Sequence, residues 1–86
     1  MRHAARRDTN EAAIVQALEA MGAQVVRVSS RGAPDVLVFW RGQQWSGEIK
    51  TGKGTLTPAQ VEAGAGRLWP IWRTPDDALR TIGAMT

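Results

Sequence analysis

The sequence predicts a single α/β domain, spanning residues 1–86, in which one sheet is covered by helices. Three observations support this fold class. Apolar residues recur at helical spacing near the N-terminus, four short segments are rich in β-branched and aromatic residues, and two Thr-Pro pairs in the second half mark helix starts. Together these signals predict the order α-β-β-β-α-β-α.

The first helix is expected over residues 8–22. Asp8 and Glu11 are spaced as a capping box, and a glycine at the end of the segment is typical of a helix C-terminus. Ile14 and Leu18 form an apolar face, and Glu11 lies on the same stripe because it precedes them by three and seven residues. Glu11 is therefore either a capping partner alone or a carboxylate facing the protein interior.

Three strands are expected next, over residues 25–28, 35–40 and 44–50. They are rich in valine and aromatic residues and are separated by polar or glycine-containing stretches. The pair Arg41-Gly42 separates the last two by a short turn, which predicts a hairpin.

The second half is expected to contain a helix, a short strand and a final helix. The helix over residues 57–66 has Thr57 as N-cap, proline at the first position and Gln60 at the third. A strand over residues 69–73 contains a proline, which favours an edge or strand-start position. The same Thr-Pro pattern opens the last helix, over residues 74–83.

The register of the hairpin brings charged side chains together. A two-residue turn pairs Trp40 with Gln43, so that the numbers of opposed residues sum to 83. Asp35 then faces Glu48 directly on one side of the sheet. Strand periodicity places Lys50 on that side as well. We therefore expect two carboxylates and one amine in a small volume.

This arrangement fits the binding of a hard divalent cation such as Mg²⁺, which prefers carboxylate oxygens, water and substrate phosphate. Lys50 would position or deprotonate an attacking water, or stabilise charge on phosphorus. Glu11 would add a third carboxylate. Structural alternatives exist: Glu48 and Lys50 as solvated sheet residues, Asp35 as the end of a turn, and Gln60, like Glu11, as a capping residue only.

Composition excludes several other kinds of chemistry. The chain has no Cys and a single histidine, His3, which rules out a disulfide framework and thiolate metal sites and argues against a Ser-His-Asp triad. It has no apolar segment long enough to span a bilayer and no secretory signal after its first arginines, so we expect a cytoplasmic protein. The net charge of +3 is a weak indication of a nucleic-acid partner.

The motif Pro-Asp at residues 34–35, Glu-Ile-Lys at residues 48–50 and the upstream Glu11 resembles the PD-(D/E)XK nuclease superfamily. Within it, the chain is most similar to the VRR-NUC (virus-type replication-repair nuclease) domain. Residues 32–38 (GAPDVLV) and 48–60 (EIKTGKGTLTPAQ) carry this likeness. The resemblance extends over essentially the whole chain.

The resemblance implies a restriction-endonuclease-like αβββαβα core, with a mixed sheet flanked by helices. It implies four metal ligands: Asp35, Glu48, Glu11 and the backbone carbonyl of Ile49. Lys50 would be the catalytic lysine, and Gln60 matches a family position near the site. Short members of the family resemble Holliday-junction resolvases and act as homodimers on branched DNA.

We therefore expect a Mg²⁺- or Mn²⁺-dependent DNA endonuclease without a small-molecule cofactor, acting as a homodimer on branched DNA in repair or recombination. A small core and four tryptophans, which we expect in the core or a subunit interface, favour dimerisation. A viral origin would place it in the host-cell cytoplasm. Phosphate contacts are expected from Arg2, Arg6, Arg7, Arg31 and Lys53. The alternatives are a nuclease for linear or single-stranded DNA and a DNA-binding module that does not cleave.

Overall fold

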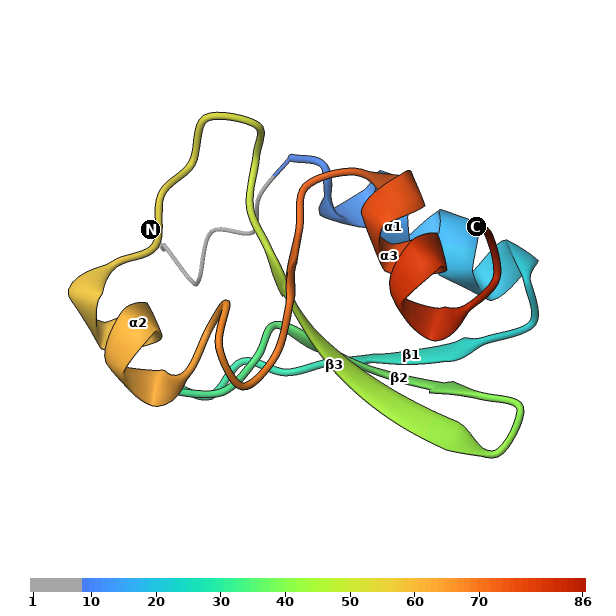
Figure 1. Cartoon of the computed structure of the whole chain (residues 1–86), viewed down its shortest axis with the longest axis horizontal. Helices are drawn as coiled ribbons and strands as arrows, with labels where there is room; N and C mark the ends of the chain where they lie inside the picture. The colour runs from blue at the N-terminus through green and yellow to red at the C-terminus, as the bar shows by residue number, and fades with distance from the viewer. Residues whose placement is uncertain (1–8) are drawn as a thin grey trace, which may run out of the picture.

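The computed structural model describes residues 9–86 (Figure 1). The elements are α1 (Glu11–Ala20), β1 (Gln24–Arg27), β2 (Val36–Trp40), β3 (Gln43–Ile49), α2 (Pro58–Ala63), β4 (Ile71–Trp72) and α3 (Pro75–Ile82). The predicted order is confirmed, although α1 begins later, α2 ends earlier and β4 is shorter than predicted. Among residues 9–86, no helix has both the length and the apolar character needed to cross a bilayer.

The four strands form one mixed sheet in the order β1-β2-β3-β4. Strands β1, β2 and β3 are antiparallel, whereas β4 runs parallel to β3. Figure 1 shows α1 and α3 side by side over one face of the antiparallel strands, while α2 lies at the end of the molecule away from the hairpin turn. The chain therefore brings the end of β3, the start of β2 and α2 to one end of the sheet.

The predicted hairpin register is confirmed, because Trp40 pairs with Gln43 and Val36 with Gly47. The two turn residues have positive φ angles, 51° at Arg41 and 77° at Gly42. Such a turn twists in the sense that matches the two strands, which is why two-residue hairpins favour it. The local chemistry of the turn thus sets which residues face each other further along the strands.

The core lies between the sheet and the two helices α1 and α3. Ile14 and Leu18 are both fully buried, which confirms the predicted apolar face of α1. Around them pack Val36, Val38, Ile49, Trp72, Ala78 and Ile82. Of the four tryptophans, Trp72 belongs to the core, whereas the other three are half-buried.

The N-terminal caps of the helices agree with the prediction in two of three cases. Thr57 and Thr74 each form a reciprocal capping box with the third residue of their helix. The capping box predicted at Glu11 is wrong: the N-cap is Asn10, its side chain makes no cap hydrogen bond, and Glu11 is the first helical residue. Asp8, its predicted partner, lies outside the described residues. The carboxylate of Glu11 is therefore available for contacts elsewhere in the fold.

Candidate functional site

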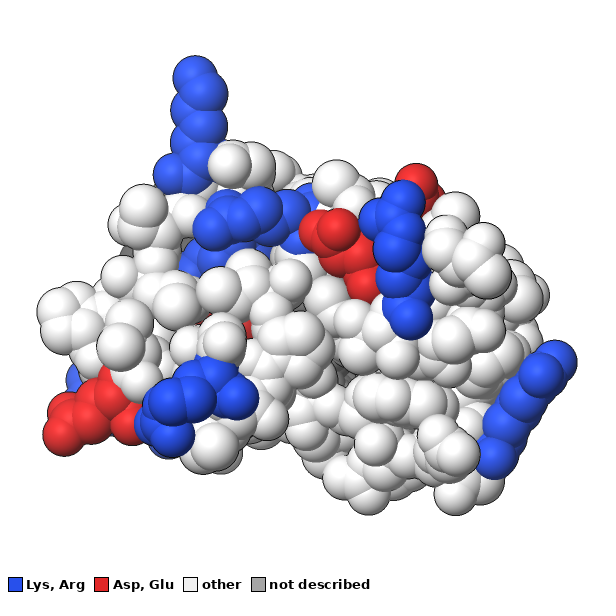
Figure 2. All heavy atoms as spheres, in the orientation of Figure 1, with Lys and Arg blue, Asp and Glu red and all other residues white. Residues whose placement is uncertain are grey.

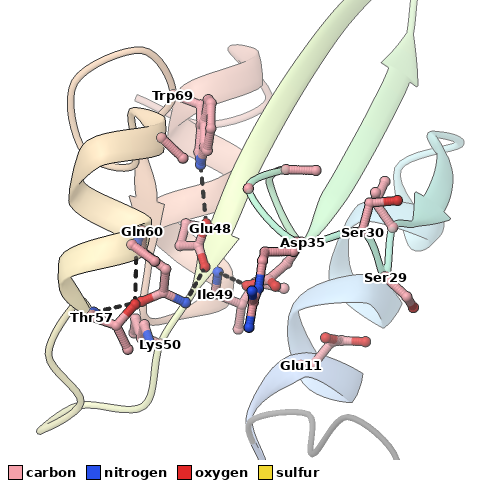
Figure 3. Close-up of a pocket in the computed structure, with 16 residues that line it drawn as sticks. Glu11, Ser29, Ser30, Asp35, Glu48, Ile49, Lys50, Thr57, Gln60 and Trp69 are labelled. Carbon is pink, nitrogen blue, oxygen red and sulfur yellow. Dashed lines mark hydrogen bonds between the residues drawn. The ribbon is translucent and has the colours of Figure 1, made fainter.

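A pocket of about 460 Å³ opens between the start of α1, the loop before β2, the end of β3 and α2 (Figure 3). All five residues predicted to be catalytic line it: Glu11, Asp35, Glu48, Lys50 and Gln60. Two further predicted site residues, Arg31 and Ile49, line it as well. The fold thus gathers at one place residues that are up to 49 positions apart in the sequence.

Asp35 lies just before β2, where the ladder between β2 and β3 ends at the pair Val36 and Gly47. The predicted direct pairing of Asp35 with Glu48 is not part of this ladder, because the backbone N–H of Asp35 donates to the carbonyl of Gly47 at 3.0 Å, one residue away from the predicted partner. Its side-chain Oδ2 accepts a hydrogen bond of 2.8 Å from the backbone N–H of Ile49. This bond fixes the carboxylate of Asp35 at the end of β3.

Glu48 is almost completely buried, with 2% of its surface exposed. Burial raises the pKa of Glu48 above its ordinary value; the charge of Asp35 and a hydrogen bond with it add to the shift, whereas the Trp69 hydrogen bond and the Lys50 charge oppose it. The two carboxyl groups are thus close enough for the negative charge of one to oppose ionisation of the other. A cation between them would relieve this repulsion.

Lys50 follows Glu48 by two residues and is half-buried at the pocket wall. Its backbone N–H donates to the carbonyl of Trp72 at 3.1 Å, so β4 holds the chain at this point. Figure 3 shows Lys50 beside Thr57 and Gln60, on the side of the pocket opposite Glu11. The amine of Lys50 is therefore placed to contact a group bound in the pocket between Lys50 and Glu11.

Gln60 has both a capping role and a role in the site. Its Oε1 accepts from the N–H of Thr57 at 2.9 Å, and its own N–H donates to Thr57 Oγ1 at 3.1 Å. Its Nε2 also donates to Glu48 Oε2 at 3.1 Å. The capping box fixes the position of the Gln60 side chain, and its amide nitrogen Nε2 is then placed to hold Glu48.

Glu11 lies on the inner face of α1 and is only 4% exposed. Its Oε2 accepts a hydrogen bond from Nε of Arg27 at 2.5 Å, so an arginine partly neutralises it. Figure 3 shows Glu11 across the pocket from Glu48. Among residues 9–86, no three Asp, Glu or His side chains lie close enough together to hold a metal ion. A ligand role for Glu11 stays a prediction.

The donor atoms near Asp35 fit a hard divalent cation. The backbone N–H groups of Glu48 and Lys50 both donate to carbonyls at β4, whereas that of Ile49 donates to Asp35. Because the N–H and carbonyl of one strand residue point to the same side, the carbonyl of Ile49 also faces the Asp35 side. Two carboxylates and one carbonyl are the oxygen donors that Mg²⁺ or Mn²⁺ prefers, with water and phosphate completing the shell.

Trp69 is a site residue that the sequence did not reveal. Its indole Nε1 donates to Glu48 Oε1 at 3.1 Å. The four tryptophans were expected to serve as core or interface anchors, and Trp69 lies 21 residues from Glu48. Only the parallel pairing of Glu48 with Ile71 brings the two together. No local signal could have indicated this contact.

Only two of the five residues predicted to contact phosphate lie within the described part of the chain. Arg31 lines the pocket, and Lys53 is exposed in the turn that follows Lys50. The predicted contacts at Arg2, Arg6 and Arg7 lie outside the described residues. On the face that Figure 2 presents, basic side chains are separated by neutral and acidic ones, without a continuous basic stripe.

Two polar side chains hold the segment after Lys50 against the rest of the fold. Asn10 Nδ2 donates to the carbonyls of Lys50 at 2.9 Å and Arg73 at 2.8 Å. Nη1 of Arg73 donates to the carbonyls of Thr51 at 2.7 Å and Gly54 at 2.8 Å. These bonds tie the start of α1, the end of β3 and the end of β4 together.

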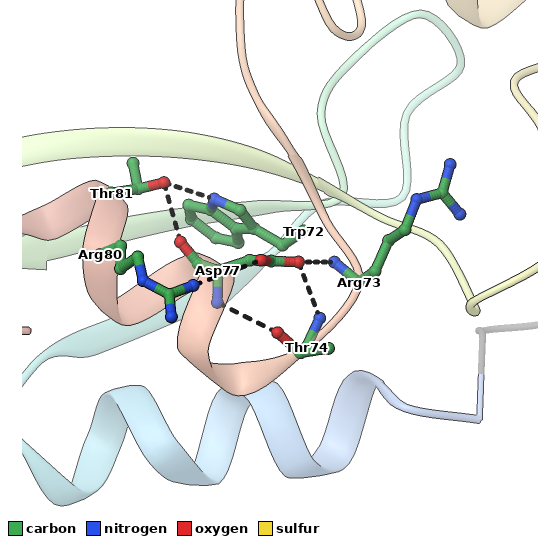
Figure 4. A network of polar contacts seen from close by, with 6 residues as sticks. All are labelled: Trp72, Arg73, Thr74, Asp77, Arg80 and Thr81. Carbon is green, nitrogen blue, oxygen red and sulfur yellow. Dashed lines mark hydrogen bonds and ion pairs between the residues drawn. The ribbon is translucent and has the colours of Figure 1, made fainter. Parts of the chain in front are cut away.

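Arg73 is itself held by α3. Its backbone N–H donates to Asp77 Oδ2 at 2.8 Å, and the same oxygen accepts from the N–H of Thr74 (Figure 4). The carboxylate of Asp77 therefore fixes the backbone from which the guanidinium reaches the loop over residues 51–54.

Arg73→Met is expected to lower the free energy of unfolding by about 1–3 kcal/mol, because hydrogen bonds from a charged donor contribute about this much. Urea denaturation measures the effect, and amide hydrogen exchange should show the loss of protection at Gly54 first. Arg80→Met is the control, since Arg80 is exposed and lies 4.0 Å from its carboxylate partner Asp77. Equal stabilities of the two variants would show that the loop does not depend on Arg73.

Comparisons of the chain with models of protein families, with curated proteins and with solved structures found no match. The chemistry of the site therefore follows from its own residues. They provide two neighbouring carboxylates, an adjacent lysine, and neutral N–H donors that hold one of the carboxylates in place.

Proposed function

We propose that the protein is a Mg²⁺- or Mn²⁺-dependent DNA endonuclease with a restriction-endonuclease-like core of the VRR-NUC type. The observation that supports this most directly is the carboxylate of Asp35, which is bound to the N–H of Ile49 next to Glu48, with Lys50 in the same pocket. The raised pKa of Glu48 is consistent with it, because a pair of crowded carboxylates is relieved when a cation binds between them.

In this proposal, a divalent cation, when bound, would supply Lewis acidity to the scissile phosphate and the attacking water. Asp35 and Glu48 would hold it, with the carbonyl of Ile49 as a third oxygen donor. The ammonium group of Lys50 stabilises negative charge that develops on the phosphate oxygens, or orients the water for in-line attack. Glu11, on the opposite wall of the pocket, would accept a hydrogen bond from a water molecule other than the attacking one.

The substrate we propose is branched DNA, such as a four-way junction, bound by a homodimer. A two-fold dimer would present two such pockets to a substrate of matching symmetry, and a chain of 86 residues has a small core that gains from association. Arg31 at the pocket and Lys53 on the exposed turn would contact phosphates, with Arg2, Arg6 and Arg7 adding further contacts. Binding should weaken as salt is raised.

Lys50→Ala is expected to reduce metal-dependent cleavage by about 10²–10³-fold, because a charge that acts on the transition state is lost. Four-way junction, linear duplex and single-stranded DNA are incubated with the protein in Mg²⁺ or in EDTA, and products are resolved on denaturing gels. We expect cleavage of the junction by the wild type in Mg²⁺ only.

Arg41→Asn is the control, since it removes one positive charge at the hairpin turn, far from the pocket, and Asn tolerates the positive φ there. It should cleave like the wild type. Cleavage confined to linear or single-stranded DNA would change the substrate in the proposal. Binding of DNA with no metal-dependent cleavage at high protein concentration would instead identify a binding module and refute the endonuclease.

A further inference from the structure

Both oxygens of the Glu48 carboxylate are held by neutral donors from two separate parts of the chain. Trp69, from the segment before β4, donates its indole N–H to Oε1, and Gln60, from α2, donates its side-chain amide to Oε2, each at 3.1 Å (Figure 3). With 2% of its surface exposed, Glu48 has little access to water as an alternative partner. Its orientation therefore depends on these donors.

Trp69 is well suited to holding another side chain still. Its carbonyl accepts a hydrogen bond of 2.7 Å from the N–H of Gly66, within a β-bridge between Ala65 and Trp69. Two residues later, Ile71 pairs with Glu48 in the parallel ladder. The backbone is thus fixed on both sides of the indole, which has only two side-chain torsions to order.

The two donors leave the other lone pairs of the carboxylate for a further ligand. Each oxygen of an ionised carboxylate can accept about two hydrogen bonds or metal contacts, and Trp69 and Gln60 occupy one on each oxygen. Figure 3 shows Asp35 on the side of Glu48 away from Trp69. A carboxylate held in this way presents its remaining lone pairs toward Asp35 and the pocket.

We propose that Trp69 is a positioning residue whose indole N–H orients Glu48 for a hard divalent cation shared with Asp35. The cation part of this proposal rests on the proposed function, whereas the hydrogen-bonded positioning of Glu48 does not require a metal. Residues that orient metal ligands in this way typically change metal affinity by about 10–100-fold when they are replaced. In Trp69→Phe the neutral donor at Oε1 would be lost, whereas Gln60 would still donate to Oε2.

The first experiment tests the positioning in the metal-free protein by NMR. The indole N–H resonance of Trp69 is assigned by its loss in Trp69→Phe. We expect it to exchange slowly with water, and Glu48→Gln should shift it and speed its exchange, because a neutral acceptor replaces a charged one. Glu19→Gln removes a charge from the exposed side of α1 and should leave the resonance unchanged. A fast-exchanging proton insensitive to Glu48→Gln would overturn the proposal.

The second experiment measures Mn²⁺ binding by calorimetry in the presence and absence of Trp69. Trp69→Phe is expected to weaken binding by about tenfold or more. Trp40→Phe is the matched control, because it also removes one indole N–H hydrogen bond, the 2.9 Å bond to the Met21 carbonyl, but at the other end of the sheet. Trp40→Phe should bind like the wild type, and Asp35→Asn should not bind.

The outcomes separate this inference from the proposed function. Equal Mn²⁺ affinity of the wild type and Trp69→Phe would refute the role of Trp69 and leave the endonuclease proposal intact. A wild type that binds no Mn²⁺ would refute the proposed function and the cation part of this inference together. In that case the NMR experiment still decides whether Trp69 holds Glu48.

Discussion

Asp35→Asn is expected to cleave no DNA and yet to melt at a higher temperature than the wild type when metal is absent. Cleavage should fall by about 10³-fold or more, beyond the loss from a single stabilising donor, because the substitution removes a ligand of the proposed cation. The gain in stability follows from Glu48, which is buried beside a second carboxyl group. Removing that second charge relieves the repulsion.

Asn at position 35 can keep the hydrogen bond that Asp35 accepts from the backbone of Ile49. Its side-chain oxygen can accept from the N–H of Ile49, as Oδ2 of Asp35 does at 2.8 Å. Its amide can donate to Glu48, which would then remain ionised with a donor in place of a competing acid. We expect a gain of about 1 kcal/mol, which corresponds to roughly 4–8 °C in a domain of this size.

The pH dependence of this gain has a definite sign. The pKa of Glu48 is raised in the folded protein, so its contribution to stability is present below the ordinary value of 4.5 and is lost as the pH rises through the raised value. Asp35→Asn removes part of the cause of that shift. The difference in melting temperature between mutant and wild type should therefore grow from below pH 4.5 toward neutral pH.

Thermal melts followed by circular dichroism, at several pH values and with or without Mg²⁺, test these expectations. Mg²⁺ should stabilise the wild type more than the mutant, because only the wild type offers both carboxylates. Glu19→Gln controls for the loss of one negative charge and should respond to Mg²⁺ like the wild type. A mutant that is less stable than the wild type and equally responsive to Mg²⁺ would contradict the prediction.

Gly47→Ala is expected to destabilise the protein by about 3 kcal/mol or more, a large part of the stability of a small domain. A Cβ atom at Gly47 would lie 2.3 Å from Cζ3 of Trp72. Trp72 is 1% exposed, and its indole N–H donates to Thr81 at 2.9 Å, so the ring has no room to move. The clash would push β3 away from the core just before Glu48.

Urea denaturation of Gly47→Ala and Gly52→Ala provides a matched comparison. At Gly52 an added Cβ meets nothing within 4 Å, so this variant should be as stable as the wild type or slightly more so. A midpoint for Gly47→Ala equal to that of the wild type would show that the core around Trp72 can rearrange. Mn²⁺ binding should weaken together with stability in Gly47→Ala, because Glu48 moves with the strand.

Local signals accounted for the elements and for one side of the candidate site. Turn chemistry at Arg41-Gly42 was enough to predict the register as far as Val36 and Gly47. This register brings Asp35 to the end of β3, where its side chain binds the N–H of Ile49 next to Glu48. The caps at Thr57 and Thr74 were likewise correct, because a capping box depends on residues three positions apart. Each of these features is decided by neighbours in the sequence or across one short turn.

The remaining contacts were decided by packing between distant segments. The capping interpretation of Glu11 failed because a buried carboxylate next to Arg27 is held by tertiary contact, which the spacing with Asp8 cannot reveal. The same holds for Trp69 at Glu48. The clash predicted at Gly47 is equally invisible in the sequence, since it depends on Trp72.

The sequence by itself thus determined the order of the elements and the register of the hairpin, which brings Asp35 close to Glu48, because turns, caps and strand periodicity act over a few residues. The tertiary structure decided which side chains hold those carboxylates. Parallel pairing of β3 with β4 brings together residues more than 20 positions apart, and that pairing is stabilised only when α1, α3 and the sheet bury a common core.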